Sequence, residues 1–227
     1  MQDWWVHKLY YGDGPVMLAA WVFWVIFSIT LHELGHGWAA IRQGDETPRE
    51  TGHMTWNPLV HMGPWSLAMF ALIGIAWGLM PTDPSRYRSG RRGRVIVALA
   101  GPFVNVVLAF ICLTALGLWL RFGATGSPFD VKLVTFLSTG GMLNVLLAGF
   151  NLLPIPPLDG SQVLMGLSWR AYRWYGNPIV RQYAFFGILA LFFIFRLGTY
   201  AFLWANQVSL AYLGLMRLIL GAPGATG

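Results

Sequence analysis

Long apolar runs separated by short polar connectors dominate the chain. An α-helix needs about 20 apolar residues to cross the hydrocarbon core of a bilayer. Five runs reach or approach this length, at residues 15–41, 95–120, 131–153, 179–195 and 197–216. A sixth apolar run, 64–80, is shorter and contains Gly74 and Gly78. We therefore predict five full membrane spans and a sixth segment that is re-entrant or lies at the membrane interface.

The connector at residues 42–63 is polar, and its stretch 52–56 alternates in a way that favours a short strand. No repeat indicates a solenoid or propeller, and no polar stretch is long enough for a separate soluble domain. The pattern predicts an all-α polytopic membrane protein with five or six transmembrane helices and a short β-like or re-entrant segment after the first. We expect one membrane domain over 1–227, with a catalytic core at about 15–165 and C-terminal helices at about 179–220.

Composition supports the membrane class. Hydrophobic residues make up 56% of the chain and charged residues 11%, whereas soluble domains carry about 25% charged residues. The net charge of +6 does not indicate nucleic-acid binding, because the basic residues lie in short connectors and act there as topology signals. Cys112 is the only cysteine and lies inside an apolar run, which excludes an internal disulfide and favours a packing role.

The basic connectors orient the predicted spans. Arginines crowd the connector 86–94, which predicts that this loop is cytoplasmic. The first run lacks a small-residue cleavage site and is preceded by acidic residues, so we expect it to remain in the mature protein. With the N-terminus outside, the loop 86–94 lies inside only if 64–80 does not cross. The chain is thus predicted to be a multi-pass protein of the cell membrane.

A metal-binding motif occurs in the first apolar run. Glu33 belongs to His32-Glu33-Leu34-Gly35-His36, and an ionisable group at membrane depth costs at least about 2.5 to 3.5 kcal/mol. Residues four apart lie one turn apart on the same face of a helix, so both imidazoles can bind one zinc ion. Zinc would make hydroxide available at neutral pH, with Glu33 as the general base. The alternative, a packed pair of core histidines, would bury three polar groups without partners.

A third ligand is needed, because catalytic zinc takes three protein ligands. Asp159 follows Pro154, Pro156 and Pro157 at the end of a long apolar run. Prolines cannot continue a regular helix, so the chain must unwind at or near membrane depth, which is tolerated only inside protein or beside a wet cavity. Asp159 by itself fits a helix cap equally well; together with the histidine motif it becomes the candidate third ligand.

Four segments resemble the site-2 protease family of intramembrane zinc metalloproteases. They occur in family order over about residues 30–165, as Leu31-His32-Glu33-Leu34-Gly35-His36-Gly37, Asn57-Pro58-Leu59-Val60-His61, Ala100-Gly101-Pro102-Phe103-Val104-Asn105 and Phe150-Asn151-Leu152-Leu153-Pro154-Ile155-Pro156-Pro157-Leu158-Asp159-Gly160. The resemblance implies that His32, His36 and Asp159 bind zinc and that Glu33 activates water. It also makes Asn151 a candidate to orient the substrate or stabilise an oxyanion.

The chain departs from the family pattern in two places. It has Gly160-Ser161 where the family usually has Gly-Gly after the aspartate, and Gly63-Pro64 where Asp often precedes the proline. These differences concern substrate handling rather than catalysis. Without a PDZ insertion or a nucleotide-sensing domain, the chain resembles the minimal branch of the family.

The expected function is hydrolysis of peptide bonds in or near transmembrane segments of other membrane proteins, from a site nearer the cytoplasmic face. The expected cofactor is Zn²⁺, and the expected partners are transmembrane protein substrates and the lipid bilayer. Two alternatives stay open, namely a membrane zincin that cuts chains at the surface and a transporter or catalytically silent chaperone. Asn105 and Asn144 are expected to hydrogen-bond between helices, while His61 either approaches the metal or, as we prefer, holds the connector.

Overall fold

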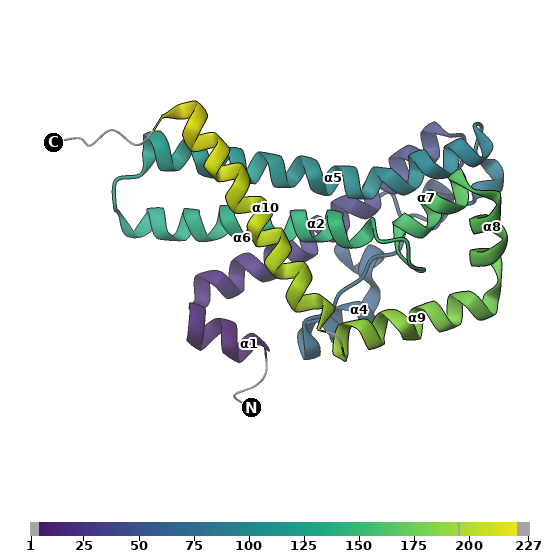
Figure 1. Ribbon diagram of the computed structural model, residues 1–227, viewed down its shortest axis with the longest axis horizontal. Helices are drawn as coiled ribbons and strands as arrows, with labels where there is room; N and C mark the ends of the chain where they lie inside the picture. The colour runs from purple at the N-terminus through teal and green to yellow at the C-terminus, as the bar shows by residue number, and fades with distance from the viewer. Residues whose placement is uncertain (1–4, 195, 222–227) are drawn as a thin grey trace.

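The computed structural model describes residues 5–194 and 196–221, and its regular structure is helical (Figure 1). The longer helices are α2 (Pro15–Arg42), α4 (Pro58–Ile73), α5 (Gly90–Leu118), α6 (Pro128–Asn151), α9 (Pro178–Phe193) and α10 (Leu197–Leu220). The shorter elements are α1 (Trp5–Lys8), η1 (Leu9–Asp13), α3 (Thr47–Glu50), η2 (Pro84–Arg86), η3 (Trp119–Gly123), α7 (Asp159–Leu167) and α8 (Trp169–Gly176).

Several helices begin at a polar cap followed by proline. The side chain of Asn57 accepts a hydrogen bond from the N–H of Leu59 at 3.0 Å, and that of Asn177 accepts one from Ile179 at 2.9 Å. Ser127 and Asp130 form a capping box at the start of α6. Such caps satisfy backbone donors that the first helical turn leaves unpaired, and the proline that follows has no N–H to satisfy. The starts of α4, α6 and α9 are thus set by local sequence.

Among the described residues, four helices are long and apolar enough to cross a membrane. They are α2, the continuous pair α5 and η3, α6 and α10. Each falls on an apolar run that the sequence pattern identifies. The prediction of an all-α polytopic membrane protein is confirmed.

The fifth predicted span is shorter than expected. Residues 179–195 were expected to cross, but α9 has only 16 residues, about 24 Å at 1.5 Å per residue, against a hydrocarbon core of about 30 Å. The chain bends just after it, where Arg196 adopts a left-handed backbone with φ 53°. Residue 195 lies outside the described part of the chain. The bend coincides with the charged residue that separates the predicted runs 179–195 and 197–216 in the sequence.

The predicted strand at 52–56 is wrong, because none of residues 5–194 or 196–221 forms a strand. This stretch is an irregular connector between α3 and α4. Its polar groups are satisfied locally instead of by a partner strand: the amide of His53 donates to the carbonyl of Pro48 at 2.9 Å, and that of Thr55 to the carbonyl of His53 at 2.9 Å. Alternation of side chains without a neighbouring strand is insufficient to form a sheet.

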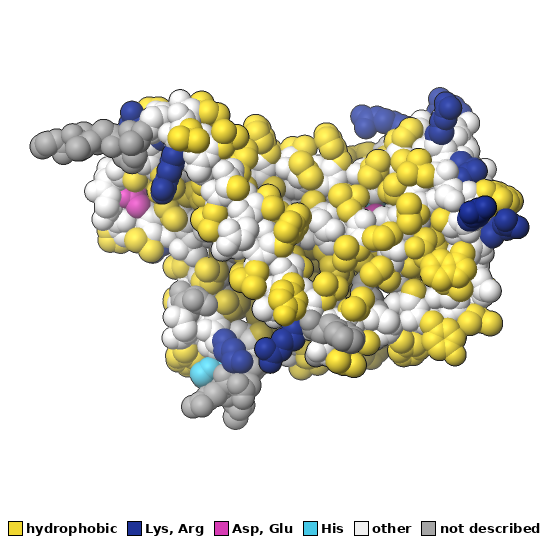
Figure 2. Space-filling model, in the orientation of Figure 1, with side chains coloured by type: hydrophobic (Ala, Val, Ile, Leu, Met, Phe, Trp, Pro, Cys, Tyr) yellow, Lys and Arg dark blue, Asp and Glu magenta, His cyan; other side chains and the backbone are white. Residues whose placement is uncertain are grey.

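Helices α2, α5 and α6 form the core of the bundle, with α5 packed against both others and against α7 (Figure 1). Glycine allows α2 and α5 to approach closely, since a Cβ on Gly35 would lie 3.0 Å from the carbonyl oxygen of Ala100. Cys112 is buried in a cluster with Trp24 and Leu143, which is the predicted packing role. Figure 2 shows hydrophobic side chains over most of this face, whereas Lys and Arg gather at its edges.

Candidate active site

Three side chains from distant parts of the sequence meet at the C-terminal part of α2. His32 and His36 lie one turn apart on that helix, and Asp159 is the first residue of α7. The two Nε2 atoms are 3.0 Å apart, and the Asp159 carboxylate lies 3.1 Å from His32 Nε2 and 3.4 Å from His36 Nε2. The histidines are buried, while the Asp159 side chain is 18% exposed. The cluster is therefore enclosed but open on the aspartate side.

The spacing of these atoms suits a tetrahedral ion. Zinc bonds of about 2.0 to 2.2 Å place neighbouring ligand atoms about 3.3 to 3.6 Å apart, close to the separations within the cluster. Space beside the ring nitrogens is kept free by Gly101 on α5, because a Cβ there would lie 2.6 Å from His32 Nε2 and closer still to His36 Nε2. The donor set and the missing side chain both fit a bound zinc ion.

The other ring nitrogen of each histidine has a partner on α5. His36 Nδ1 lies 2.7 Å from the carbonyl oxygen of Val97. Since a carbonyl can only accept, Nδ1 carries the proton and Nε2 keeps its lone pair for the cluster. His32 Nδ1 lies 2.6 Å from Asn105 Oδ1. Partners of this kind fix the ring orientation of histidines that bind metals.

Glu33 lies beside the cluster under a polypeptide cover. Its side chain is buried, and Gly78 approaches it so closely that a Cβ on Gly78 would be 2.6 Å from Glu33 Cγ. The side chain of Met80 packs against Gly37 of α2, where a Cβ would lie 3.0 Å from its terminal methyl group. The segment after α4 therefore covers the end of α2 that carries the motif.

This cover is a hairpin made by residues 64–80. Helix α4 is kinked at Gly63 and ends at Ile73. Gly74, the next residue, has a left-handed backbone, and the chain then runs back along the helix. Ser66 Oγ donates to the carbonyl of Trp77 at 2.6 Å and accepts from its N–H at 2.9 Å, while the amide of Leu79 donates to the carbonyl of His61 at 2.9 Å. The segment returns to its starting point, a course that fits both alternatives predicted for it, a re-entrant segment and one that lies at the membrane interface.

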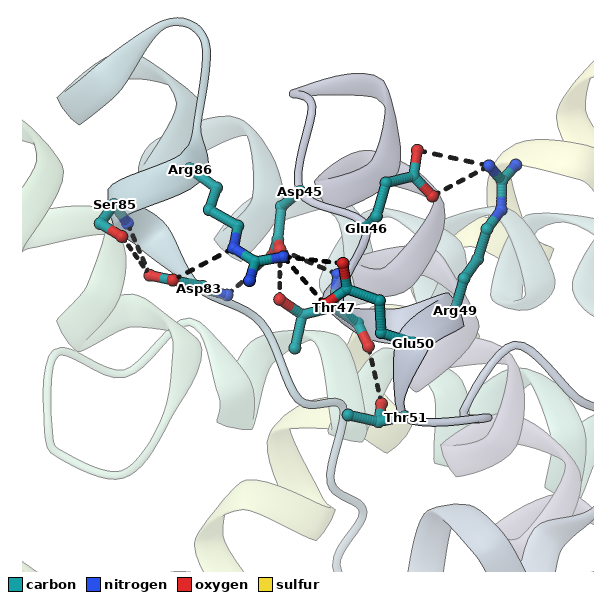
Figure 3. Close-up of polar contacts among 9 residues, drawn as sticks. All are labelled: Asp45, Glu46, Thr47, Arg49, Glu50, Thr51, Asp83, Ser85 and Arg86. Carbon is teal, nitrogen blue, oxygen red and sulfur yellow. Dashed lines mark hydrogen bonds and ion pairs between the residues drawn. The ribbon is translucent and has the colours of Figure 1, made fainter.

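A polar network anchors the far end of the cover (Figure 3). Asp45, fully buried, accepts hydrogen bonds from the amide and hydroxyl of Thr47 at 3.0 and 2.5 Å and from the amide of Asp83 at 2.7 Å. Arg86 pairs with Glu50 at 2.9 Å. The Ser85 hydroxyl and amide hold the pKa of the Asp83 carboxyl below its usual range. The connector after α2 is thereby tied to the chain entering α5.

Two other residues predicted from the sequence, Asn151 and His61, form hydrogen bonds outside the cluster. The amide of Asn151, the last residue of α6, donates to the carbonyl of Leu147 at 3.0 Å and is not bonded to the cluster. His61 is buried, with Nε2 2.7 Å from the carbonyl of Thr55, so it holds the connector as preferred. The closeness of Gly78 to Glu33 carried no recognisable signal in the sequence. Asn105 could be singled out because it is a polar residue within an apolar run, but the sequence did not indicate that its partner is His32.

A bundle of apolar helices around a His-His-Asp cluster and an adjacent glutamate defines the class of membrane metallopeptidases with a His-Glu-x-x-His motif. The chain belongs to peptidase family M50, whose model, described as "Peptidase family M50", matches residues 20–124 and 123–195. It is a zinc metallopeptidase of the site-2 protease type.

Named relatives agree with this assignment. The chain is 35% identical to "Putative zinc metalloprotease YwhC" of Bacillus subtilis, over 86% of this chain and 88% of that protein. It is 35% identical to "Putative zinc metalloprotease Rip2" of Mycolicibacterium smegmatis, over 68% of this chain and 58% of that protein. "Zinc metalloprotease MJ0392" of Methanocaldococcus jannaschii is 24% identical over 66% of this chain and 37% of its own length. No solved structure gives a significant match.

Proposed function

We propose that this chain is an intramembrane zinc endopeptidase that hydrolyses peptide bonds in or near the transmembrane segments of other membrane proteins. The main support is the cluster of buried His32, buried His36 and partly exposed Asp159, which lies beside Glu33 within a bundle of apolar helices. A carboxylate and two imidazoles at this depth are explained by a bound cation and are costly without one.

In this proposal His32 and His36 hold zinc through Nε2 and Asp159 holds it through its carboxylate. When bound, zinc supplies Lewis acidity, which makes water a competent nucleophile near neutral pH and polarises a carbonyl. Glu33 accepts the proton of the attacking water and delivers a proton to the leaving amine. The cover over Glu33 limits the access of bulk water to this carboxylate.

We place the site nearer the cytoplasmic face. Asp159 begins α7, which packs against α5, and Arg94 near the start of α5 donates to Gln162 of α7 at 2.8 Å. Arg91, also near the start of α5, lies over the ring of Trp169 at 5.8 Å, so the arginine-rich start of α5 and helix α8 share one end of the bundle. Cytoplasmic loops are the ones that carry excess arginine and lysine.

The proposal is tested with purified protein in liposomes and two substrates that share one segment of sequence. One substrate is a single-span membrane protein and the other is a soluble peptide that contains only its segment outside the bilayer. We expect zinc-dependent cleavage of the membrane protein, within or next to its span, as located by mass spectrometry. Cleavage confined to the soluble peptide would favour a surface-acting zincin, and no cleavage by the zinc-loaded protein would favour a transporter or chaperone.

Asn151 is proposed to stabilise the oxyanion once substrate releases its amide from the carbonyl of Leu147. Asn151→Ala should then lower kcat by about 100-fold, a typical loss for one oxyanion donor, with little change in KM. The matched control is Thr135→Ala, because Thr135 on the same helix also donates to the carbonyl four residues back, at 2.7 Å. Equal kcat values for both variants in the liposome assay would remove Asn151 from the mechanism.

A further inference from the structure

We infer that Asn105 and Asn144 are positioning residues that fix the tautomer of His32 through a hydrogen-bond relay across three helices. This inference rests on the proposed function, since it concerns the nitrogen that His32 offers to zinc. The relay starts on α2, passes through α5 and ends on the backbone of α6. It assigns a role to two buried amides that neither belong to the zinc cluster nor face solvent.

The relay consists of three bonds in sequence. His32 Nδ1 lies 2.6 Å from Asn105 Oδ1, Asn105 Nδ2 donates to Asn144 Oδ1 at 2.9 Å, and Asn144 Nδ2 donates to the carbonyl of Gly140 at 2.9 Å. Both asparagine side chains are fully buried and His32 is 6% exposed. Because water does not compete at these positions, each amide is held in the orientation that its protein partners require.

The direction of the relay is set at its last member. The carbonyl of Gly140 can only accept, so the amino group of Asn144 must face it and the Asn144 oxygen must face Asn105. That oxygen in turn requires the amino group of Asn105, which leaves the Asn105 oxygen toward His32. A ring nitrogen beside an oxygen acceptor must carry a proton, so His32 is protonated at Nδ1 and keeps the Nε2 lone pair for the metal.

The opposite orientation would conflict with metal binding. If the Asn105 amide were reversed, its amino group would face Nδ1 and would require a lone pair there, which moves the proton of neutral His32 to Nε2. That proton would point at Asp159 and His36, at the place where zinc is to bind. Reversal would also set the Asn105 oxygen against the Asn144 oxygen, leaving buried acceptors without donors. The relay therefore stabilises the only neutral tautomer that can bind zinc through Nε2.

The two histidines reach the same state by different routes. His36 Nδ1 is fixed directly by the carbonyl of Val97, and His32 Nδ1 is fixed by the carbonyl of Gly140 through two amides. A purely structural pair of asparagines would need only the bond between Asn105 and Asn144. The additional short bond from His32 links that pair to the zinc site.

The test measures zinc affinity by competition with a chromophoric chelator, using purified wild-type protein, Asn105→Leu, Asn105→Asp and Asn144→Leu. Asn105→Leu should bind zinc about 10- to 100-fold more weakly, the usual loss when the partner of a ligand is removed. Asn105→Asp keeps an oxygen acceptor for Nδ1 and should remain within a few-fold of wild type, whereas Asn144→Leu should show a smaller loss than Asn105→Leu. The control Thr114→Val removes another interhelical bond, from Thr114 to Tyr212 at 2.6 Å, and should not change zinc affinity.

Equal affinities for wild type and Asn105→Leu, or an equal loss in Asn105→Asp and Asn105→Leu, would overturn the relay. Should the leucine variants fail to fold, ¹⁵N NMR of zinc-free, histidine-labelled wild-type protein decides instead: neutral His32 should carry its proton on Nδ1, and neutral His32 with its proton on Nε2 would overturn the inference. The proposed function fails separately, if the wild-type protein binds no zinc.

Discussion

Glu33→Gln should lower the rate of substrate cleavage by about 100- to 10,000-fold, the range that general acid–base groups contribute. Glutamine fills the same volume beneath Gly78 but has no carboxylate to accept a proton. Glu33 is adjacent to a cluster residue but is not itself one of the three proposed zinc ligands, so the variant should retain one zinc per chain. Cleavage of the membrane substrate and metal content, measured on the same preparation, check both statements.

The matched control is Glu46→Gln, which removes a carboxylate from the exposed connector and breaks only its surface pair with Arg49. Surface pairs of this kind contribute little to stability, so cleavage should be unchanged. If Glu33→Gln cleaved as fast as Glu46→Gln, the proton would have to be carried by another group. If Glu33→Gln lost its zinc, Glu33 would belong to the metal site and not to proton transfer.

Gly101→Ala should abolish activity by preventing zinc from binding. The added methyl group would meet the Nε2 atoms of both histidines, so α5 must move away or the rings must rotate. Either change separates the three ligand atoms, and sites of this kind tolerate displacements of only about 0.5 Å. We expect zinc affinity to fall by at least about 100-fold, more than the range for partners outside the ligand set.

Gly117→Ala is the control on the same helix, because the three atoms nearest to its new methyl group would all belong to the side chain of Met216, at 3.3 to 3.4 Å. It should bind zinc as the wild type does. Overpacking alone costs about 1 to 3 kcal/mol of stability, and thermal unfolding of the two variants separates that effect from metal loss. Normal zinc content in Gly101→Ala would show that the space beside the ring nitrogens is not needed.

The fold follows from sequence wherever length and hydropathy decide it. Four apolar runs became long helices, and the prolines before Asp159 interrupt the chain between α6 and α7 as expected. The run 179–195 was the exception: it was expected to cross the membrane, but α9 has only 16 residues. The prediction of a strand at 52–56 was wrong because alternating side chains indicate only that a segment could be a strand. They do not show that a second strand is present to pair with it.

For the candidate site, too, some residues can be predicted from the sequence and others cannot. The spacing of His32 and His36 on one helix is a local property, and it can be seen in the sequence. Asp159 could be identified by the need for a third ligand and by the family resemblance. The partners of these residues could not, because the contact of Asn105 with His32 and that of Gly78 with Glu33 depend on how distant segments pack.

Three contacts on the site come from one side of α5, at Val97, Gly101 and Asn105, which are spaced by four residues. Each residue of an α-helix turns the chain by about 100°. Inserting or deleting one residue between Val97 and Asn105 would therefore rotate at least one contact out of the site, even if every side chain were kept. The length of this stretch is constrained as strongly as its composition, whereas the loop between α5 and α6 holds none of these three contacts.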